Sequence, residues 1–358
     1  MDESAAYIVE DLRKYFDQEK VWSDFVGLEY ESAVEDILRQ LLEEERLDFR
    51  NPAHQNRKFL YRYALPYICF SMQQAREYFA SARGATLLTK PLLLYYGMMS
   101  FVRALITLVS PDFFTDQEDL YHGVKMMDRG PSGYRLADRR LRVARNGLFP
   151  QMHTIISGEK TMETPLTLLD VFTRLPDLYY NCLYIYDLSD EDMNCIRLVQ
   201  AGVRKEDKEG TMWVQIEAEA GGTLRPERLP GLLAEAFQEV NGDRPVHIWV
   251  SRTRSGDLDE VGKILTRLRE LSLDEEKFLI CPLPSSKGRQ VQFSEVELHY
   301  LLMFYLSNIA RYQPHLWGEL LIGRKTAETL LVRNFIESSE KKFSCLVHTQ
   351  IFRNILLG

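Results

Sequence analysis

The chain has 358 residues, of which 45% are hydrophobic and 27% are charged, and its formal net charge is −8. This composition predicts a globular protein that is long enough to bury a sizeable core in about two domains. The negative charge excludes a generally basic surface for nucleic acid or for an anionic membrane, although a local basic patch is compatible with it.

The cysteines and the N-terminus indicate a reducing compartment. The five cysteines form no CxxC pair, which argues against a disulfide framework and against zinc-ligand spacing. The seven histidines are scattered along the chain and make no metal-binding pattern. Residues 1–7 lack the basic and apolar regions of a signal peptide. We therefore expect a cytoplasmic protein without a metal or another cofactor.

The first part of the chain predicts helices. Residues 1–50 are typical of two amphipathic helices, and the second, Ser32–Arg46, has apolar residues at helical spacing. A third helix is expected from about Pro52, because proline suits the first turn of a helix. Pro66 should interrupt or kink it, and a further helical segment continues to Ala82.

The longest apolar segment, Lys90–Val109, is also expected to be a helix, ended by Ser110 and Pro111. It reaches membrane-spanning length only with Arg103 included, and a charge in mid-segment is costly in lipid. We therefore expect a buried helix of a soluble protein and no membrane contact. Small residues at spacings of three or four should let another helix approach closely; they are Gly97, Ser100, Ala104 and Thr107.

The middle of the chain has a different pattern. Arg139–Val143 alternates like a short strand, Thr164 is a candidate cap for a helix over Pro165–Leu175, and helical patterning returns at Leu178–Tyr186. Between 190 and 292 strands and helices alternate in a βαβ-type rhythm. The expected strands are 194–201, 212–218, 246–251 and 278–281, and the expected helices are 226–240 and 258–271.

Helices are expected again from residue 294 onward, over 294–312, 315–322, 326–339 and 343–356. The predicted fold class is therefore α+β and mainly helical, with a bundle assembled from both ends of the chain around a small α/β insert. The predicted divisions are N-terminal amphipathic helices (1–50), a helical body with a basic loop region (51–189), the insert (190–292), and helices that complete the bundle (293–358).

Four motifs occur in order along the chain: Lys90-Pro-Leu-Leu-Leu-Tyr-Tyr-Gly-Met, Leu120-Tyr-His-Gly-Val, Arg145-Asn-Gly-Leu-Phe, and His299-Tyr-Leu-Leu-Met-Phe-Tyr-Leu-Ser followed by Ala310-Arg-Tyr and Trp317-Gly-Glu-Leu. With these motifs the chain resembles the YaaC-like proteins of Gram-positive bacteria over roughly residues 50–355. The resemblance implies a bacterial cytosolic protein and no particular reaction or catalytic residue. The frequent position of such genes beside purine-nucleotide genes implies nucleotide-linked regulation.

The first candidate site lies in the loop region. His122, Arg129 and Asn146 are accompanied by glycines and by several arginines between 135 and 145, in a chain that is acidic overall. Arginine and histidine are suited to hold a phosphate or carboxylate, and glycine lets backbone approach a ligand closely. The alternative is a loop that only caps the bundle, with its arginines paired to Asp128, Asp138 and the acidic N-terminal helices. No dinucleotide-binding or P-loop fingerprint is present.

The second candidate site lies on the last apolar helical segment, Glu297–Trp317, which carries Ser307 and Arg311. A buried arginine needs partners, so this group is either a structural network or part of a polar site that Arg103 shares. Arg311 and His315 also resemble the Arg…His motif of HEPN-type helical ribonucleases. Their spacing is shorter than in that motif, and Pro314 breaks the helix between them.

The sequence thus favours a non-catalytic cytosolic regulator or binding module. We expect it to recognise an anionic small molecule, most nearly a nucleotide, or a protein partner. The residues expected to contact the ligand are Lys90, Arg103, His122, Arg129, Asn146 and Arg311. The alternatives are a HEPN-like ribonuclease or nucleotide-processing enzyme that uses Arg311 and His315, and an oligomeric scaffold; the sequence leaves the oligomeric state open.

Overall fold

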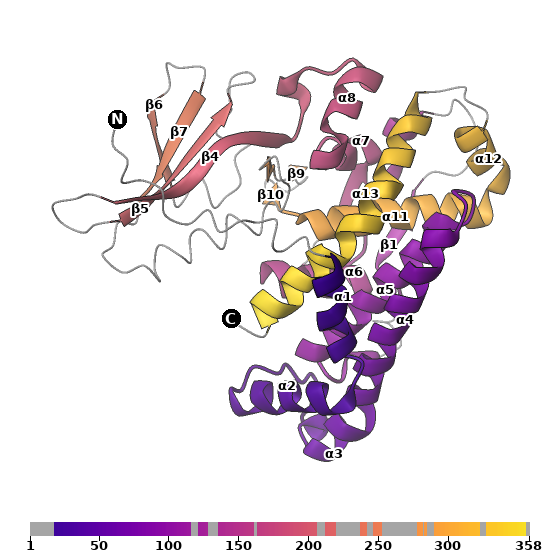
Figure 1. Cartoon of the computed structure of the whole chain (residues 1–358), viewed down its shortest axis with the longest axis vertical. Coiled ribbons are helices and arrows are strands. Elements are labelled where there is room, and N and C mark those ends of the chain that lie inside the picture. Colours follow the sequence, from indigo (N-terminus) through magenta and orange to yellow (C-terminus); the bar gives the residue numbers. More distant parts are fainter. Residues whose placement is uncertain are drawn as a thin grey trace. The chain divides into compact units, whose positions relative to one another are not determined.

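The computed structural model describes residues 18–115, 121–127, 135–160, 163–205, 212–219, 237–241, 246–252, 278–281, 283–284, 290–322 and 327–355. The described residues form two compact units, which are treated one at a time below. Unit 1 includes the described part of 172–295, and unit 2 includes the described parts of 16–171 and 296–358. The fold is mainly helical with small antiparallel sheets, so the predicted α+β class is confirmed (Figure 1).

Unit 2 is assembled from both ends of the chain (Figure 1). Its first part runs through α1 (Gln18–Gly27), α2 (Glu31–Glu43), α3 (Arg57–Phe59), a π-helical turn (Leu60–Ala64), α4 (Leu65–Gly84), α5 (Lys90–Val109), β1 (Val124–Met126), β2 (Arg140–Val143), α6 (Leu148–Ser157), β3 (Thr164–Thr167) and α7 (Leu168–Phe172). Its second part contains α11 (Glu295–Tyr312), α12 (Pro314–Ile322), α13 (Glu328–Thr349) and a π-helical turn (Gln350–Ile355).

The centre of unit 2 is the pair of long helices α4 and α5, which run side by side (Figure 1). Gly97 on α5 makes this approach close, because a Cβ atom built there would lie 2.6 Å from a ring carbon of Phe79 on α4. Phe79 and Phe101 are both buried and in ring contact. The absence of a side chain at Gly97 therefore makes room for the aromatic core, as its place in the small-residue stripe predicts.

Helix α13 closes the bundle against the N-terminal helices. The Phe343 ring lies 6.3 Å from Phe79 and 6.4 Å from Phe101, measured between ring centroids. His348 Nε2 lies 2.8 Å from a carboxylate oxygen of Asp24 on α1. Both carboxylate oxygens of the buried Glu328 accept from the backbone N–H of Leu136, at 2.9 and 3.1 Å. Contacts between distant parts of the chain thus hold the bundle together.

Helix α5 is the only helix among the described residues that is long and apolar enough to cross a membrane. Its most apolar window has a mean hydropathy of 1.7, and 72% of that window is buried inside the protein. Burial of that kind is typical of the central helix of a soluble core.

The small sheet of unit 2 corrects one sequence prediction. Its order is β1-β2-β3, and β3 occupies Thr164–Thr167, where the sequence predicted a helix from Pro165 capped by Thr164. Leu166 is buried opposite Leu141 of β2, and this pairing with a neighbouring strand outweighs the local helical pattern. Helix α7 begins only at Leu168. At its start the Asp170 carboxylate accepts a hydrogen bond from the backbone N–H of Thr167, at 2.8 Å.

Unit 1 contains helix α8 (Tyr179–Tyr186) and an antiparallel sheet of order β6-β7-β5-β4-β8. Its strands are β4 (Cys195–Lys205), β5 (Met212–Glu219), β6 (Phe237–Asn241), β7 (Val246–Ser251) and β8 (Phe278–Ile280), and a two-stranded ladder joins β9 (Leu283–Pro284) to β10 (Gln290–Val291). The four predicted strands of this region are present. The predicted βαβ rhythm is wrong for the described strands, since every pairing among them is antiparallel.

Two helix boundaries also differ from the prediction. Strand β6 begins at Phe237, inside the C-terminal end of the predicted helix 226–240. The two helices predicted at 326–339 and 343–356 form one helix, α13, because no glycine or proline interrupts Glu328–Thr349. The predicted helix 258–271 lies outside the described residues.

We predict that Gly97→Ala lowers the free energy of unfolding by about 1–3 kcal/mol, because the added methyl group must displace the Phe79 ring from a packed core. Gly318→Ala on α12 is the matched control: a Cβ atom there meets nothing within 4 Å, and alanine favours a helix. Urea unfolding of both variants should show a loss for Gly97→Ala alone. Equal stability of the two would contradict the close contact.

Candidate functional site

Two glycine turns hold His122 in place. Gly123 (φ +74°) and Gly147 (φ +118°) both have left-handed backbone conformations, which other residues rarely adopt. The turns are in direct contact, since a Cβ atom on Gly147 would lie 2.7 Å from the Gly123 backbone. Backbone N–H groups after Gly147 donate to the carbonyls of Tyr121 (2.7 Å) and His122 (3.2 Å). The His-Gly and Asn-Gly motifs of the sequence therefore form one structural element.

His122 begins a chain of hydrogen bonds that enters the helical core. Its Nδ1 atom lies 2.7 Å from the Tyr95 hydroxyl on α5, and that hydroxyl lies 3.2 Å from the Tyr300 hydroxyl on α11. Burial raises the pKa of Tyr95 well above its usual value and raises the pKa of Tyr300 to about 12. Both tyrosines therefore keep their protons at neutral pH, so Tyr95 has a proton to donate to the imidazole.

Arg311 lies beside this chain on α11. Its Nη1 atom donates to the Tyr96 hydroxyl at 2.7 Å, and its guanidinium carbon lies 4.6 Å from the ring centroid of Tyr312. The Nε atom of Arg311 is buried and has no hydrogen-bond partner. The guanidinium is therefore held in position while part of its donor capacity is unused.

Arg103 on α5 belongs to the same group. Its charge, with that of Arg311, acts on both Tyr95 and His122. The Arg103 Nε atom is also buried without a hydrogen-bond partner. Burial, then the charge of Arg311, then that of Arg103 lower the pKa of His122, so this imidazole is neutral at pH 7. We call this group the arginine cluster; its members are Tyr95, Tyr96, Arg103, His122, Tyr300 and Arg311.

The arginine cluster has positive charge without a carboxylate counter-charge among the described residues. Within the part of the chain that the structure describes, no carboxylate forms an ion pair with Arg103 or Arg311. Both residues are half-buried, and removing a guanidinium from water costs free energy unless an anion or polar groups replace the water. A phosphate or carboxylate bound to these guanidiniums would supply the missing counter-charge.

The other residues predicted to bind ligand are not part of this cluster. Lys90 forms an ion pair with Glu340 of α13, with Nζ and Oε2 2.6 Å apart, which gives it a structural role. Asn146 is exposed in the second glycine turn, and Arg129 lies outside the described residues. His315 is exposed in the first turn of α12, after Pro314 has ended the helix that carries Arg311.

Sequence reasoning missed Tyr95 as the link between His122 and the core. The sequence does indicate which face of α11 is involved. Tyr300, Phe304 and Arg311 are spaced by four and seven residues, so they share one helix face. Nothing in the local sequence shows which helix that face meets. The contact with Tyr95 depends on packing between residues 205 positions apart.

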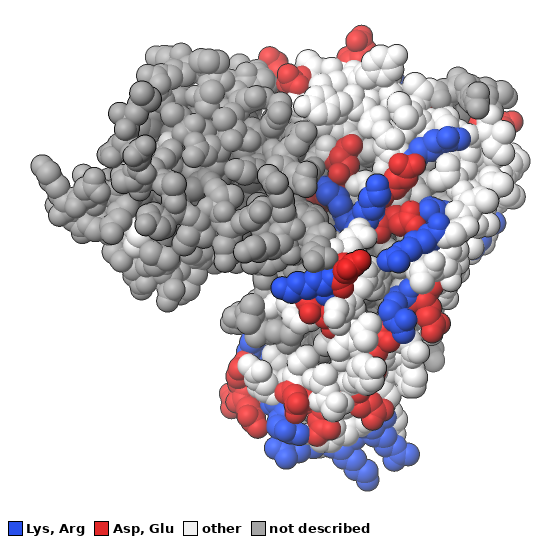
Figure 2. Space-filling view, viewed as in Figure 1, with Lys and Arg blue, Asp and Glu red and all other residues white. Residues whose placement is uncertain are grey.

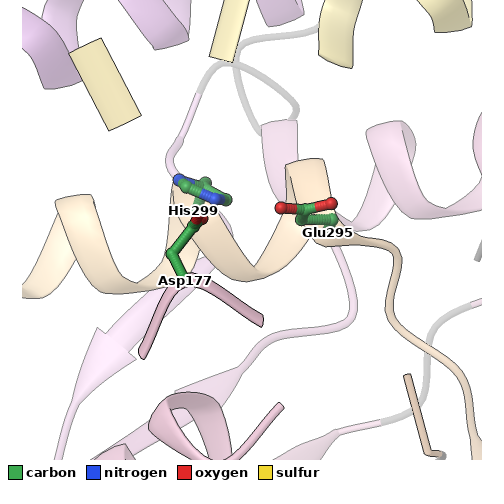
Figure 3. A group of neighbouring side chains, drawn as sticks. All are labelled: Asp177, Glu295 and His299. Carbon is green, nitrogen blue, oxygen red and sulfur yellow. The ribbon is translucent and has the colours of Figure 1, made fainter. Parts of the chain in front are cut away.

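Helix α11 carries three more buried polar groups. His153 Nδ1 on α6 lies 2.7 Å from the carboxylate of Glu297, and His299 Nδ1 lies 2.6 Å from the Ser339 hydroxyl. Burial lowers the pKa of His153, but the Glu297 charge and hydrogen bond outweigh burial and raise it overall. Glu295 and His299 lie one turn apart on α11 (Figure 3). Asp177 and Glu295 belong to unit 1 and His299 to unit 2, so the three make no metal site within either unit.

We predict that Gly147→Ala lowers the free energy of unfolding by at least ~2 kcal/mol, because its Cβ atom would clash with the Gly123 backbone and its φ is unfavourable. Gly158→Ala is the matched control, since it shares a positive φ (+74°) but has open space around it. Chemical unfolding should give a distinctly smaller loss for Gly158→Ala. Equal losses would mean that backbone strain, and not contact between the turns, sets the cost.

Comparison with known proteins adds one finding to this geometry. No curated protein and no solved structure matches the chain. A family model described as YaaC-like Protein matches residues 28–351, which include the whole arginine cluster and nearly all of the helical unit. The chain therefore belongs to the YaaC-like protein family, as its motifs indicate.

Proposed function

We propose that this YaaC-like protein is a non-catalytic, cytoplasmic binding protein for a small anionic molecule, and that the arginine cluster holds the anionic group. The observation that carries this proposal is the pair of half-buried guanidiniums with unused Nε donors and no carboxylate partner among the described residues. An anion between Arg103 and Arg311 would accept from both, and neutral His122 adds a further polar contact.

A phosphate-containing ligand, and a nucleotide in particular, fits the surroundings of this cluster best. A phosphate group has more acceptor oxygens than a carboxylate, so it can accept hydrogen bonds from two separate guanidiniums more readily. Tyr121 and Tyr312, the sequence neighbours of His122 and Arg311, have exposed fractions of 70% and 68%. Exposed rings next to a phosphate site are suited to stack on a planar base. The nucleotide-linked regulation that the family resemblance implies agrees with this choice.

A binding role is favoured over a reaction because the cluster lacks a group that is poised for catalysis. Tyr95 and Tyr300 have raised pKa values and remain protonated, so neither serves as a base at neutral pH. The ribonuclease alternative needs Arg311 and His315 to act together, but Arg311 is engaged with Tyr96 and His315 lies exposed on the next helix. The binding protein would act as a regulator through a protein partner.

The first prediction from this proposal concerns the stability of the protein with and without ligand. A ligand that binds only the folded state at about 100 times its Kd adds roughly 2.7 kcal/mol to the free energy of unfolding. The assay is thermal unfolding with inorganic phosphate, pyrophosphate and nucleoside phosphates. We expect one of these anions to stabilise the wild type and also Arg145→Gln, a control that alters an exposed arginine outside the arginine cluster. Arg103→Gln and Arg311→Gln should lose this effect.

The same variants separate a ligand site from a structural network. Without ligand, Arg103→Gln should be at least as stable as the wild type, because it removes a half-buried charge that has no counter-charge among the described residues. A structural network predicts the opposite sign, a clear loss of stability without ligand. Anion stabilisation that persists in both variants would contradict the proposed site.

The second prediction concerns pH. In the free protein the pKa of His122 is lowered, and a bound anion would favour the imidazolium and raise that pKa. Between the two pKa values, binding takes up a proton, so anion affinity should rise as pH falls through this window and level off below it. Titration calorimetry across pH should show this rise for the wild type and a flatter profile for His122→Gln. Matching profiles would place the bound anion away from His122.

A further inference from the structure

A second basic region lies in unit 2, in the segment Arg50–Tyr63 that contains α3. From Phe49 to Arg76 the sequence has five basic residues and no acidic one, although the net charge of the chain is −8. Figure 2 shows Lys and Arg side chains at the lowest edge of the view, where Figure 1 places α3, with Asp and Glu side chains above them. We call the exposed side of residues 50–63 the α3 surface.

Three basic side chains of the α3 surface are free to meet an anion. Arg57, Lys58 and Arg62 are exposed, and among the described residues no carboxylate forms an ion pair with any of them. On helix α2 the carboxylates of Glu35 and Asp36 pair with Arg39, at 2.7 and 3.4 Å, and not with these three residues. The positive charge of this surface is therefore available to an external partner.

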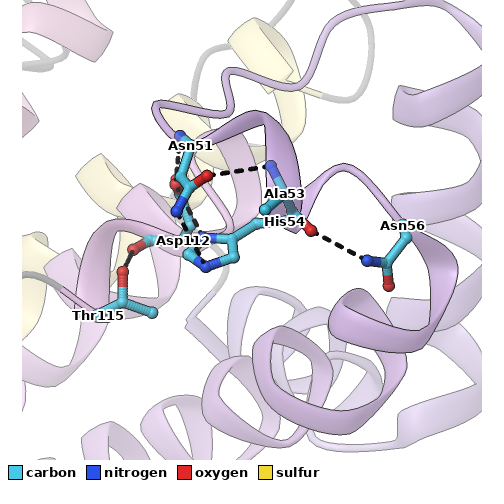
Figure 4. Close-up of polar contacts among 6 residues, drawn as sticks. All are labelled: Asn51, Ala53, His54, Asn56, Asp112 and Thr115. Atoms are coloured by element: carbon cyan, nitrogen blue, oxygen red, sulfur yellow. Dashed lines mark hydrogen bonds and ion pairs between the residues drawn. The ribbon is translucent and has the colours of Figure 1, made fainter.

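The loop before α3 is held in a fixed shape (Figure 4). Asp112 is 2% exposed, and its Oδ2 atom accepts from the Asn51 backbone N–H at 3.0 Å and lies 3.3 Å from His54 Nδ1. Asn51 and Asn56 side chains cap the turns that follow them, at 3.0 and 2.8 Å. The buried carboxylate and the two caps thus orient the ring of His54.

Aromatic rings lie among these positive charges. The His54 ring stacks on Phe59 with a centroid distance of 4.3 Å and an interplanar angle of 7°. Tyr63 is 47% exposed, and the Arg62 guanidinium lies over its ring at 5.5 Å. Unpaired cations interleaved with partly exposed rings are the combination that holds single-stranded nucleic acid, through phosphate contacts and base stacking.

We propose that the α3 surface binds single-stranded nucleic acid, with phosphates on Arg57, Lys58 and Arg62 and a base stacked on Tyr63. A membrane is the less fitting partner, because the exposed ring carries a hydroxyl group and lies beneath a guanidinium instead of projecting as an apolar wedge. This site is separate from the arginine cluster and does not depend on the function proposed for it.

The test is fluorescence anisotropy of the full-length protein with labelled oligo(U) and oligo(dT) of about 15 nucleotides, over about 50–200 mM salt. The wild type should bind, with log affinity falling linearly with log salt at about 0.7 per neutralised phosphate. The triple variant Arg57→Gln, Lys58→Gln, Arg62→Gln should reduce that slope by about 2 and bind more weakly. Tyr63→Ala should weaken binding roughly tenfold with the salt slope unchanged.

The matched control changes the same number of charges elsewhere in the unit. Lys125→Gln, Lys160→Gln, Lys341→Gln alters three exposed residues and should bind like the wild type. Arg103→Gln should also bind the oligonucleotide normally, which separates this site from the small-anion site. Melting temperatures of all variants check that each one folds.

Three outcomes would overturn the proposal. The first is no binding of either oligonucleotide at low salt. The second is equal loss of binding in the two triple variants, which would reveal a general charge effect. The third is binding to vesicles that contain the anionic lipid phosphatidylglycerol without binding to oligonucleotides, which would assign the surface to an anionic membrane.

Discussion

The positive charge between α5 and α11 is the constraint on which the rest of this account depends. Arg103 and Arg311 come from the two ends of the chain, are half-buried, and have buried Nε donors with no hydrogen-bond partner. Water is partly removed from both guanidiniums, and no carboxylate of the described residues replaces it. A protein retains such an arrangement at a cost in stability unless an anion offsets it, which is the reason for proposing an anion site between these helices.

The fold makes that interface out of long-range contacts. Gly97 lets α4 approach α5, the Lys90–Glu340 ion pair joins α5 to α13, and the Tyr95–Tyr300 contact joins α5 to α11. The paired glycine turns then place His122 over the end of this hydrogen-bond chain. Each of these features fixes a helix of this group or the imidazole of His122, so the positions of these side chains depend on packing across the whole unit.

Much of the fold follows from the sequence, because helical periodicity and strand alternation are local properties. Helices α5, α11 and α12 and strands β2, β4, β5, β7 and β8 lie close to where the sequence predicts them. Strand direction in unit 1 and the strand at Thr164–Thr167 were predicted wrongly, since pairing depends on residues far away in the chain. For the site, the charges of Arg103 and Arg311 act on His122, and their role in ligand binding stays a prediction. Lys90 is engaged by Glu340, a partner 250 positions away that no local pattern indicates.

The most direct measurement of the central claim is the NMR spectrum of the arginine Nε–Hε groups, assigned with Arg103→Lys and Arg311→Lys, during titration with phosphate and a nucleoside phosphate at constant ionic strength. Our account predicts that the Arg103 and Arg311 signals shift together and saturate at the same anion concentration, while the signal of exposed Arg145 stays unchanged. Signals of Arg103 and Arg311 that do not move with any anion, or that move no more than that of Arg145, would contradict it.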